Sequence, residues 1–162
     1  MGICNRSIKT LSVCGGRGFL GADIYSPSLE LEFWIFNVYG ACQDRMAFWR
    51  PLLNSSLLLQ DNVIIGGYLN FSLGYSKSWG NHAQVDVMTG LFENLLETHS
   101  LVNVPSPKKQ PTWRNNRVGE VSLARRLDHF LTKEGMISGG HGIRQWVSSG
   151  GLSDHRPIYL EI

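Results

Sequence analysis

Asp128 is a carboxylate inside an apolar, strand-like run of the sequence, Leu127 to Thr132. A charged group in a protein interior needs an opposite charge or hydrogen bonds to compensate for lost hydration. Arg126 or a distant histidine would provide such a partner. Two interpretations follow: a structural salt bridge, or a carboxylate that orients a functional histidine.

Ser153-Asp154-His155 places a second carboxylate beside a histidine, directly before the last strand-like run. Neighbouring side chains point to opposite sides of an extended backbone, so Asp154 and His155 are not expected to pair with each other. One can bind a cation while the other pairs with a distant carboxylate such as Asp128. Such a pairing fixes the tautomer of a histidine and raises its basicity. Taken alone, the tripeptide is also typical of a surface turn.

Asn70 ends the segment Gly66-Gly67-Tyr68-Leu69-Asn70, which follows an apolar run. A polar residue just past a buried strand lies where α/β proteins usually form their sites. The amide of Asn70 offers donors and an acceptor to a phosphate. The alternative, an asparagine in a tight turn after two glycines, is favoured by this segment alone.

Basic residues gather between positions 108 and 126, where Glu120 is the only acid. Together with Trp113, this composition suits a phosphate backbone with one aromatic contact. A solvated basic face is the alternative. The basic residues are Lys108, Lys109, Arg114, Arg117, Arg125 and Arg126.

The segment Gly16 to Gly21 matches the GxGxxG pattern of dinucleotide-binding loops. Such a loop must open a helix, and Pro27 would break a helix begun at Gly21 within two turns. We therefore predict a turn-rich loop here and no dinucleotide site.

The chain has 162 residues, of which 43% are hydrophobic and 17% charged, and its net charge is +2. These values exclude a disordered tail, and the net charge is too small to indicate a partner. Cys4, Cys14 and Cys42 form no CxxC pair, which favours a reducing compartment with the cysteines as apolar fillers. No apolar run approaches the ~20 residues that cross a bilayer, and the N-terminus does not resemble a signal peptide. We expect an intracellular protein, nuclear or cytoplasmic, that is not secreted.

Strands and helices alternate along the chain and must position these residues. The aromatic and branched run Leu31–Tyr39 predicts a strand buried on both faces, and Asn62–Leu69 predicts a second. A helix is expected from about Asp44, kinked or shortened by Pro51. After a loop over 74–84, apolar residues from 88 to 99 keep a helical rhythm, with Asp86 as the expected cap. Three short strands are expected near Thr112-Trp113, Leu127–Thr132 and Pro157–Ile162.

Strands interleaved with helices predict a single α/β or α+β domain. In chain order, the motifs resemble those of the endonuclease/exonuclease/phosphatase family. The resemblance is strongest to the endonuclease domain of plant LINE-type (non-LTR) retrotransposon polyproteins, and it covers residues 15–162, leaving 1–14 unassigned. It rests on Asn37-Val38-Tyr39-Gly40, Arg45, Phe48-Trp49, Gly66-Gly67-Tyr68-Leu69-Asn70, Thr112-Trp113, Arg126-Leu127-Asp128 and Ser153-Asp154-His155.

The resemblance implies two packed β-sheets flanked by helices, incomplete at the N-terminus, and phosphoester cleavage with Mg²⁺ or Mn²⁺. It implies that Asp154 helps to hold the metal and that His155, oriented by Asp128, binds the phosphate. By the same resemblance, Asn70 positions the nucleophile or phosphate and Tyr39 lines the site. The candidate nucleic-acid contacts are Arg45, Lys108, Lys109, Trp113, Arg114, Arg117 and Arg126.

Two departures from the family pattern affect the expected activity. The family has Gly-Asp-Phe/Leu-Asn where this chain has Gly67-Tyr68-Leu69-Asn70. The missing aspartate is the one expected to activate water, and a phenol with a reference pKa of about 10 is a poor base at neutral pH. The family's metal-binding Glu, carried by N-terminal strands, has no counterpart upstream of Gly15.

We therefore expect a truncated, degenerate nuclease-like domain derived from a retroelement. The alternatives are a non-catalytic nucleic-acid-binding module and a phosphodiesterase completed by another chain. The expected partner is DNA, with RNA second, and neither a membrane nor a stable protein partner is expected.

We predict both the geometry of the site and the exposure of one strand. Asn70, Asp128, Asp154 and His155 should converge at one end of the sheets, with Asp128 and His155 about 2.6–3.2 Å apart. The strand Leu31–Tyr39 should be left uncovered by the missing strands, so that the isolated chain associates with itself.

Overall fold

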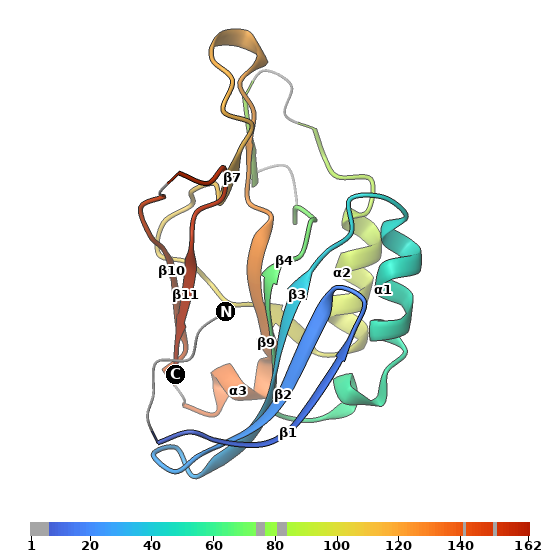
Figure 1. Cartoon of the computed structure of the whole chain (residues 1–162), viewed down its shortest axis with the longest axis vertical. Coiled ribbons are helices and arrows are strands. Elements are labelled where there is room, and N and C mark those ends of the chain that lie inside the picture. Colours follow the sequence, from blue (N-terminus) through green and yellow to red (C-terminus); the bar gives the residue numbers. More distant parts are fainter. Residues whose placement is uncertain (1–6, 74–76, 81–83, 141, 151) are drawn as a thin grey trace.

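A mixed six-stranded sheet forms the centre of the fold in the computed structural model, which describes residues 7–73, 77–80, 84–140, 142–150 and 152–162 (Figure 1). Only β3 and β4 run parallel, and all other neighbours are antiparallel. Its strands, in spatial order, are β1 (Lys9–Gly16), β2 (Phe19–Ser26), β3 (Leu31–Tyr39), β4 (Val63–Tyr68), β9 (Asp128–Lys133) and β6 (Leu101–Asn103).

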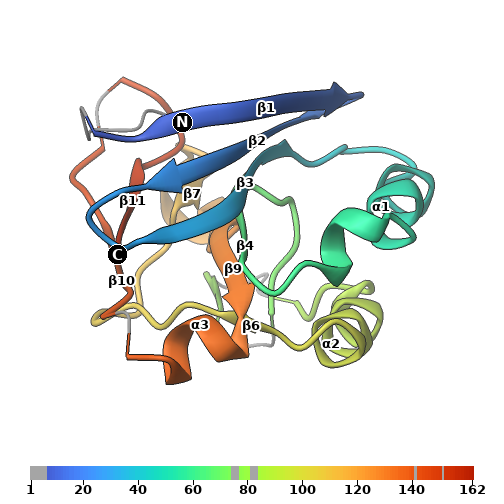
Figure 2. The ribbon, with the colours of Figure 1, turned by 90° about the horizontal axis from the view of Figure 1, so that it is seen from below.

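Two small sheets and three helices surround this main sheet. Helices α1 and α2 lie on one side of it, and β10–β11 and α3 lie on the other (Figure 2). The expectation of packed sheets flanked by helices is therefore confirmed. The small sheets are β5 (Ser78–Trp79), β8 (Ala124–Arg125) and β7 (Trp113–Arg114), and β10 (Arg144–Val147) with β11 (Ile158–Glu161). The helices are α1 (Arg45–Leu53), α2 (Thr89–Thr98) and α3 (Glu134–Ser138), with 3-10 turns at Ser56–Leu59 and Gly119–Val121.

Strand β3 serves two apolar cores because its side chains alternate between the faces of the sheet. Phe36 and Val38 are buried in the core beneath α1 and α2. Phe33 is buried in a second core on the opposite face, and Ile35 packs against it. The prediction of a strand buried on both faces is thus correct.

The two longer helices form close to where the apolar rhythm predicts them. Helix α1 ends two residues after Pro51, and Trp49 in it is buried. Asp86 does not cap α2, whose N-cap is Met88 without a side-chain hydrogen bond. The carboxylate of Asp86 instead accepts a hydrogen bond from the backbone N–H of Met88 at 2.9 Å and pairs with Arg45. The stretch 74–84 contains β5 and lies partly outside the described residues.

The glycine-rich segment is a β-hairpin, and the prediction of a loop was wrong. Strands β1 and β2 pair from Gly16↔Phe19 onwards, and Gly18 turns the chain with a φ of +78°. A side chain at Gly21 would lie 2.5 Å from the ring of Phe36, which explains the glycine there. Because a strand follows Gly21, the helix that a dinucleotide site requires does not form.

This hairpin also corrects one expectation about the N-terminal part of the sheet. The main sheet begins at Lys9, whereas the resemblance covers residues from 15 onwards. Strand β3 pairs with β2 on one edge and β4 on the other, so it is not the uncovered strand that was expected. The edge strand on this side of the sheet is β1, whose side chains are mostly exposed, and β6 forms the other edge. None of the helices in the described part of the chain is long and apolar enough to cross a membrane.

His129 in β9 is a fully buried histidine. Its ring stacks on Phe71 with centroids 5.3 Å apart, and Nε2 lies 3.1 Å from the carbonyl oxygen of Arg126. Burial, followed by the charge of Arg126, lowers the pKa of His129 to about 3. The imidazole is therefore neutral in the folded protein.

We expect acid to destabilise the protein through His129. The unfolded chain takes up a proton at this histidine below about pH 6.5, whereas the folded chain does so only near pH 3. The free energy of unfolding should therefore fall by about 1.5 kcal/mol between pH 6.5 and 5 because of this group. Urea unfolding at both pH values should show a smaller difference for His129→Phe. An unchanged difference would show that the buried ring is not neutral.

Candidate active site

The candidate site lies at the upper end of the main sheet in Figure 1, where β3 and β4 end and β9 begins. The register places three residues side by side: Tyr39 of β3 lies opposite Tyr68 of β4, which lies opposite Asp128 of β9. The rings of Tyr39 and Tyr68 are 5.3 Å apart, and Tyr39 is 69% exposed. The two tyrosine rings and the carboxylate of Asp128 therefore come from three neighbouring strands.

His155 reaches this group from the segment before β11. Its Nδ1 lies 2.9 Å from Oδ2 of Asp128, within the distance expected from the sequence. Its ring also meets the ring of Tyr68 edge-on, with centroids 4.9 Å apart. The predicted pairing of Asp128 with His155 is confirmed.

Thr112 holds the two partners of this pair in position, although the sequence analysis gave it no such role. Its Oγ1 accepts the backbone N–H groups of Leu127 and Asp128, each at 3.0 Å. Its carbonyl oxygen accepts the N–H of Arg156 at 2.7 Å. Because Thr112 is fully buried, these bonds have no competition from water. A buried hydroxyl requires such partners, but only the fold shows which ones it finds.

The hydrogen bond to Asp128 raises the pKa of His155 above the usual value for histidine. Burial acts in the opposite direction, and the charges of Asp128 and Asp154 add to the increase. The bond uses Nδ1, and no described residue bonds to Nε2. Asp128 therefore orients the ring of His155 and favours its protonated form. Nε2, to which no described residue bonds, is left for a ligand.

Tyr68 cannot replace the carboxylate that the resemblance places at its position. Burial raises the pKa of its phenol far above the usual range, and contacts with Cys42, Tyr39 and Asp128 raise it further. Its hydroxyl lies 3.9 Å from Sγ of Cys42, an exposed thiol and not the apolar filler expected. Tyr68 therefore stays protonated and can donate a hydrogen bond, but it cannot take a proton from water.

Asn70 lies two residues beyond Tyr68 and uses its side chain to hold the backbone. Its Nδ2 donates to the carbonyl oxygen of Ala41 at 2.7 Å, and its own backbone is left-handed, with a φ of 54°. A Cβ atom at Gly40 would lie 2.5 Å from the carbonyl oxygen of Leu69, so the two loops touch. The amide nitrogen is therefore engaged in joining the loops that follow β3 and β4.

Asp154 is exposed, and its Oδ2 accepts the indole N–H of Trp113 at 2.9 Å. The indole thus fixes the carboxylate beside His155 instead of contacting a ligand freely. No group of three His, Cys, Asp or Glu residues in the described part of the chain is arranged to hold a metal ion. Asp128 is committed to His155 and Tyr68 is a neutral phenol, so these residues by themselves do not fit Mg²⁺ or Mn²⁺.

Two arginines expected to contact nucleic acid are partly or fully buried: Arg45 is held by an ion pair, and Arg126 has two buried guanidinium nitrogens without a hydrogen-bond partner. Arg45 forms a two-point ion pair with Asp86 and donates to the carbonyl oxygen of Asn70 at 2.8 Å. The bond to Asp86 raises the pKa of Arg45, and the guanidinium joins α1 to the loop before α2. Arg126 is 1% exposed, and burial lowers its pKa. Neither side chain belongs to an open basic face, because each one packs into the fold.

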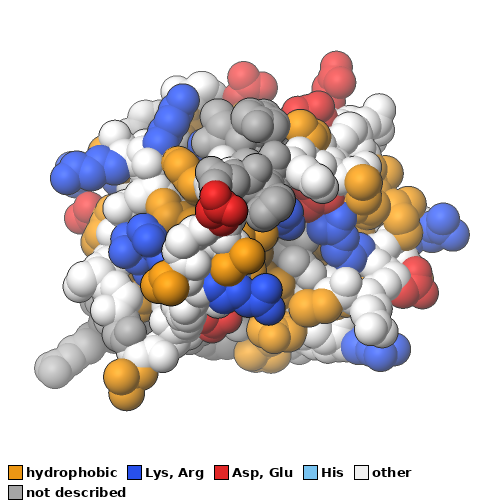
Figure 3. Space-filling model, turned by 90° about the horizontal axis from the view of Figure 1, so that it is seen from above, with side chains coloured by type: hydrophobic (Ala, Val, Ile, Leu, Met, Phe, Trp, Pro, Cys, Tyr) orange, Lys and Arg blue, Asp and Glu red, His pale blue; other side chains and the backbone are white. Residues whose placement is uncertain are grey.

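The remaining basic residues of the segment do reach the surface. Lys108, Lys109, Arg114 and Arg117 are exposed, whereas Arg125 is half-buried in β8. Seen from above, lysines and arginines on this end of the molecule are spread out among hydrophobic and acidic side chains (Figure 3). The basic surface is therefore discontinuous.

Comparison with solved structures identifies the class of fold. The endonuclease domain of TRAS1, a telomere-specific non-LTR retrotransposon, is similar over 90% of this chain, with a TM-score of 0.71 and 17% identity. The AP endonuclease LMAP from Leishmania major is similar over 87%, with a TM-score of 0.62 and 14% identity. The inositol polyphosphate 5-phosphatase domain of SpSynaptojanin, solved with inositol (1,4)-bisphosphate and a calcium ion, is similar over 95%, with a TM-score of 0.59 and 15% identity.

The chain thus has the endonuclease/exonuclease/phosphatase fold. It spans 63% of the TRAS1 chain, 53% of the LMAP chain and 54% of the SpSynaptojanin chain. No protein-family model matches the sequence, and a search of curated proteins finds no relative. The structures therefore establish the fold, and the activity must be argued from the site.

We predict that Asp128→Asn lowers the pKa of His155, because the largest cause of its increase is removed. The titration of the His155 ring protons, followed by NMR, measures this directly. Asp154→Asn is the matched control, and its effect should be smaller because Asp154 acts only through its charge. Equal shifts in the two variants would contradict the role given to Asp128.

Proposed function

We propose that this chain is a degenerate nuclease-like domain, derived from a retroelement, that binds a phosphate of nucleic acid but does not cleave it. The observation that carries the proposal is the oriented His155 beside the neutral Tyr68. The first is suited to hold an anion, and the second lacks the basicity that hydrolysis requires.

The favoured protonated form of His155 and the direction of its Nε2 support binding of a phosphate. Asp128 favours its protonated form, and the bond to Nδ1 leaves Nε2 directed away from the carboxylate. A charge-assisted hydrogen bond from such an imidazolium to a phosphate oxygen is stronger than a neutral one. Tyr68 can add a second donor from the neighbouring strand, since its phenol keeps its proton.

The contacts and protonation states of Asp154 and Tyr68 disfavour hydrolysis. A metal-assisted reaction needs oxygen ligands for the cation and a base for water. Asp154 is a lone exposed carboxylate already bonded to Trp113, and Tyr68 stands where the base is expected. We derive no cleavage step from these residues.

DNA is the ligand that we favour, with RNA second. The similarity to the TRAS1 endonuclease domain supports a retroelement origin, and a plant LINE-type element remains our specific proposal. The exposed Lys108, Lys109, Arg114 and Arg117 can contact phosphates of the nucleic-acid backbone.

The second candidate is a phosphodiesterase completed by another chain, with Mg²⁺ or Mn²⁺ bound only in the complex. It is favoured by one observation: the chain spans less than two thirds of the TRAS1 endonuclease chain. A cleavage assay separates the two candidates.

We predict salt-dependent binding of a fluorescent DNA duplex, weaker for Lys108→Ala and Lys109→Ala. Each lost phosphate contact should reduce the slope of log K against log salt by about 0.9. Arg144→Ala is the matched control, because Arg144 on β10 is exposed but pairs with Glu161 of β11. His155→Ala should weaken binding about tenfold at pH 6, and the difference should shrink as the pH rises and the imidazolium of the parent chain loses its proton. Binding that is independent of salt and of His155 would refute the proposal.

We predict no Mg²⁺-dependent nicking of plasmid DNA above background by the purified chain. A missing general base alone costs about 10²–10⁴-fold in rate. Tyr68→Asp alone should not restore cleavage, because the donor set for the metal is still incomplete. Robust nicking by the unaltered chain that is lost in His155→Ala would favour the second candidate.

A further inference from the structure

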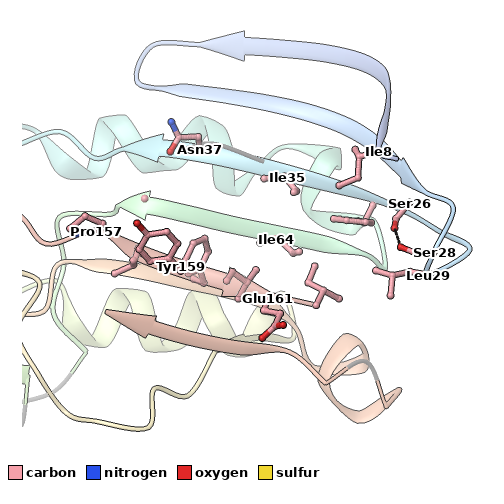
Figure 4. Close-up of a pocket in the computed structure, with 16 residues that line it drawn as sticks. Ile8, Ser26, Ser28, Leu29, Ile35, Asn37, Ile64, Pro157, Tyr159 and Glu161 are labelled. Carbon is pink, nitrogen blue, oxygen red and sulfur yellow. Dashed lines mark hydrogen bonds between the residues drawn. The ribbon is translucent and has the colours of Figure 1, made fainter. Parts of the chain in front are cut away.

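An apolar cleft of about 750 Å³ separates the main sheet from β11, on the face away from α1 and α2 (Figure 4). One wall is formed by side chains of the main sheet, and the other by residues 157–162. Glu161 is the only charged residue among the described ones that line it, and its carboxylate pairs with Arg144. The main-sheet residues are Phe33, Ile35, Ile64 and Phe130.

The free edge of β11 faces this cleft. Successive residues of a strand point to opposite faces, so a cavity against one face would meet only alternate residues. Here all six consecutive residues, 157–162, line the cavity. Strand β10 occupies the other edge of β11, and none of its residues lines the cleft. Among the residues that the structure describes, only β10 pairs with β11, so the backbone N–H and C=O groups on its other edge have no strand partner there.

The second apolar core is also incomplete at this place. Phe33, Ile64 and Phe130 are buried in it, but Ile35, Ile158 and Leu160 are only partly covered. The core beneath α1 and α2, in contrast, is closed by both helices. A contiguous apolar surface beside a free strand edge favours a ligand that is apolar and can also complete a backbone ladder.

We propose that the cleft is the docking site of a β-strand from a separate polypeptide segment with alternating apolar and polar residues. This strand pairs with the free edge of β11 and packs its apolar side chains on the main sheet. The length comparison is in line with an additional segment, because more than a third of the TRAS1 endonuclease chain has no counterpart here. An acyl chain could fill the volume but could not pair with the backbone of β11.

The docked strand would also end beside the candidate site. Asn37, Gly67 and Pro157 line the cleft, and they are close neighbours in sequence of Tyr39, Tyr68 and His155. The partner can therefore bring a side chain to the Asp128–His155 pair. The docking itself does not depend on whether the chain binds or cleaves nucleic acid.

A tethered strand tests this proposal without an unknown partner. The chain is extended beyond Ile162 by an Asn-Gly turn and about five alternating valine and threonine residues, which can fold back only on the free edge of β11. We expect the melting temperature to rise by about 3 °C or more. Backbone amides of β11 that do not bond to β10 should become protected from hydrogen exchange.

Two controls make the result specific. The same extension with a central proline cannot form the ladder and should give no rise. In the extended chain, Ile35→Asp should remove the rise, whereas Leu20→Asp, on an exposed position outside the cleft, should leave it. An equal rise with the proline control would overturn the proposal. So would a dimer of the unaltered chain that Ile35→Asp dissociates, because a second copy would then occupy the cleft.

Discussion

The antiparallel pairing of β4 with β9 is the constraint on which the site depends. It places Tyr68 opposite Asp128, while the parallel pairing of β3 with β4 places Tyr39 on the other side of Tyr68. A shift of β4 by one residue would turn Tyr68 to the opposite face of the sheet, away from Tyr39 and Asp128. His155 completes the group from a segment that the bonds of Thr112 fasten to the start of β9.

The buried surroundings of this pairing explain why neighbouring groups have such different charge states. His155 is held near one carboxylate and is partly open to water, so its cationic form is favoured. His129, next to Asp128 in sequence, points into the core and is neutral. Tyr68 lies between these environments and keeps its proton because burial disfavours the phenolate. These three states are the basis of our proposal that the site binds an anion and lacks a base.

Closure of the fold is uneven, and this has a functional consequence. Two helices seal one face of the main sheet, whereas the two strands β10 and β11 cover the other face only in part. The open part runs from the C-terminal residues toward Asn37 and Gly67, beside the candidate site. Whatever strand fills it would therefore complete the core and the surroundings of His155 together.

Local patterns in the sequence were sufficient for the elements whose side chains face two cores. The runs around Leu31–Tyr39 and Asn62–Leu69 and the rhythm of α2 depend on spacing alone, and the structure agrees with them. The pairing of Asp128 with His155 could also be foreseen, since a buried carboxylate requires a partner. The glycine-rich hairpin was missed because its glycines are selected by contacts across the sheet, such as that of Gly21 with Phe36.

The sequence by itself thus determined the main strands, the helical faces and the residue types of the site. Only the tertiary structure decided which charges are free: Arg45 is bound to Asp86, Arg126 is buried, and Lys108 and Lys109 reach the solvent. It also decided the role of Thr112 and the open edge of β11. The physical reason is that periodicity is a property of neighbours along the chain, whereas burial and the choice of a partner depend on residues that meet only after folding.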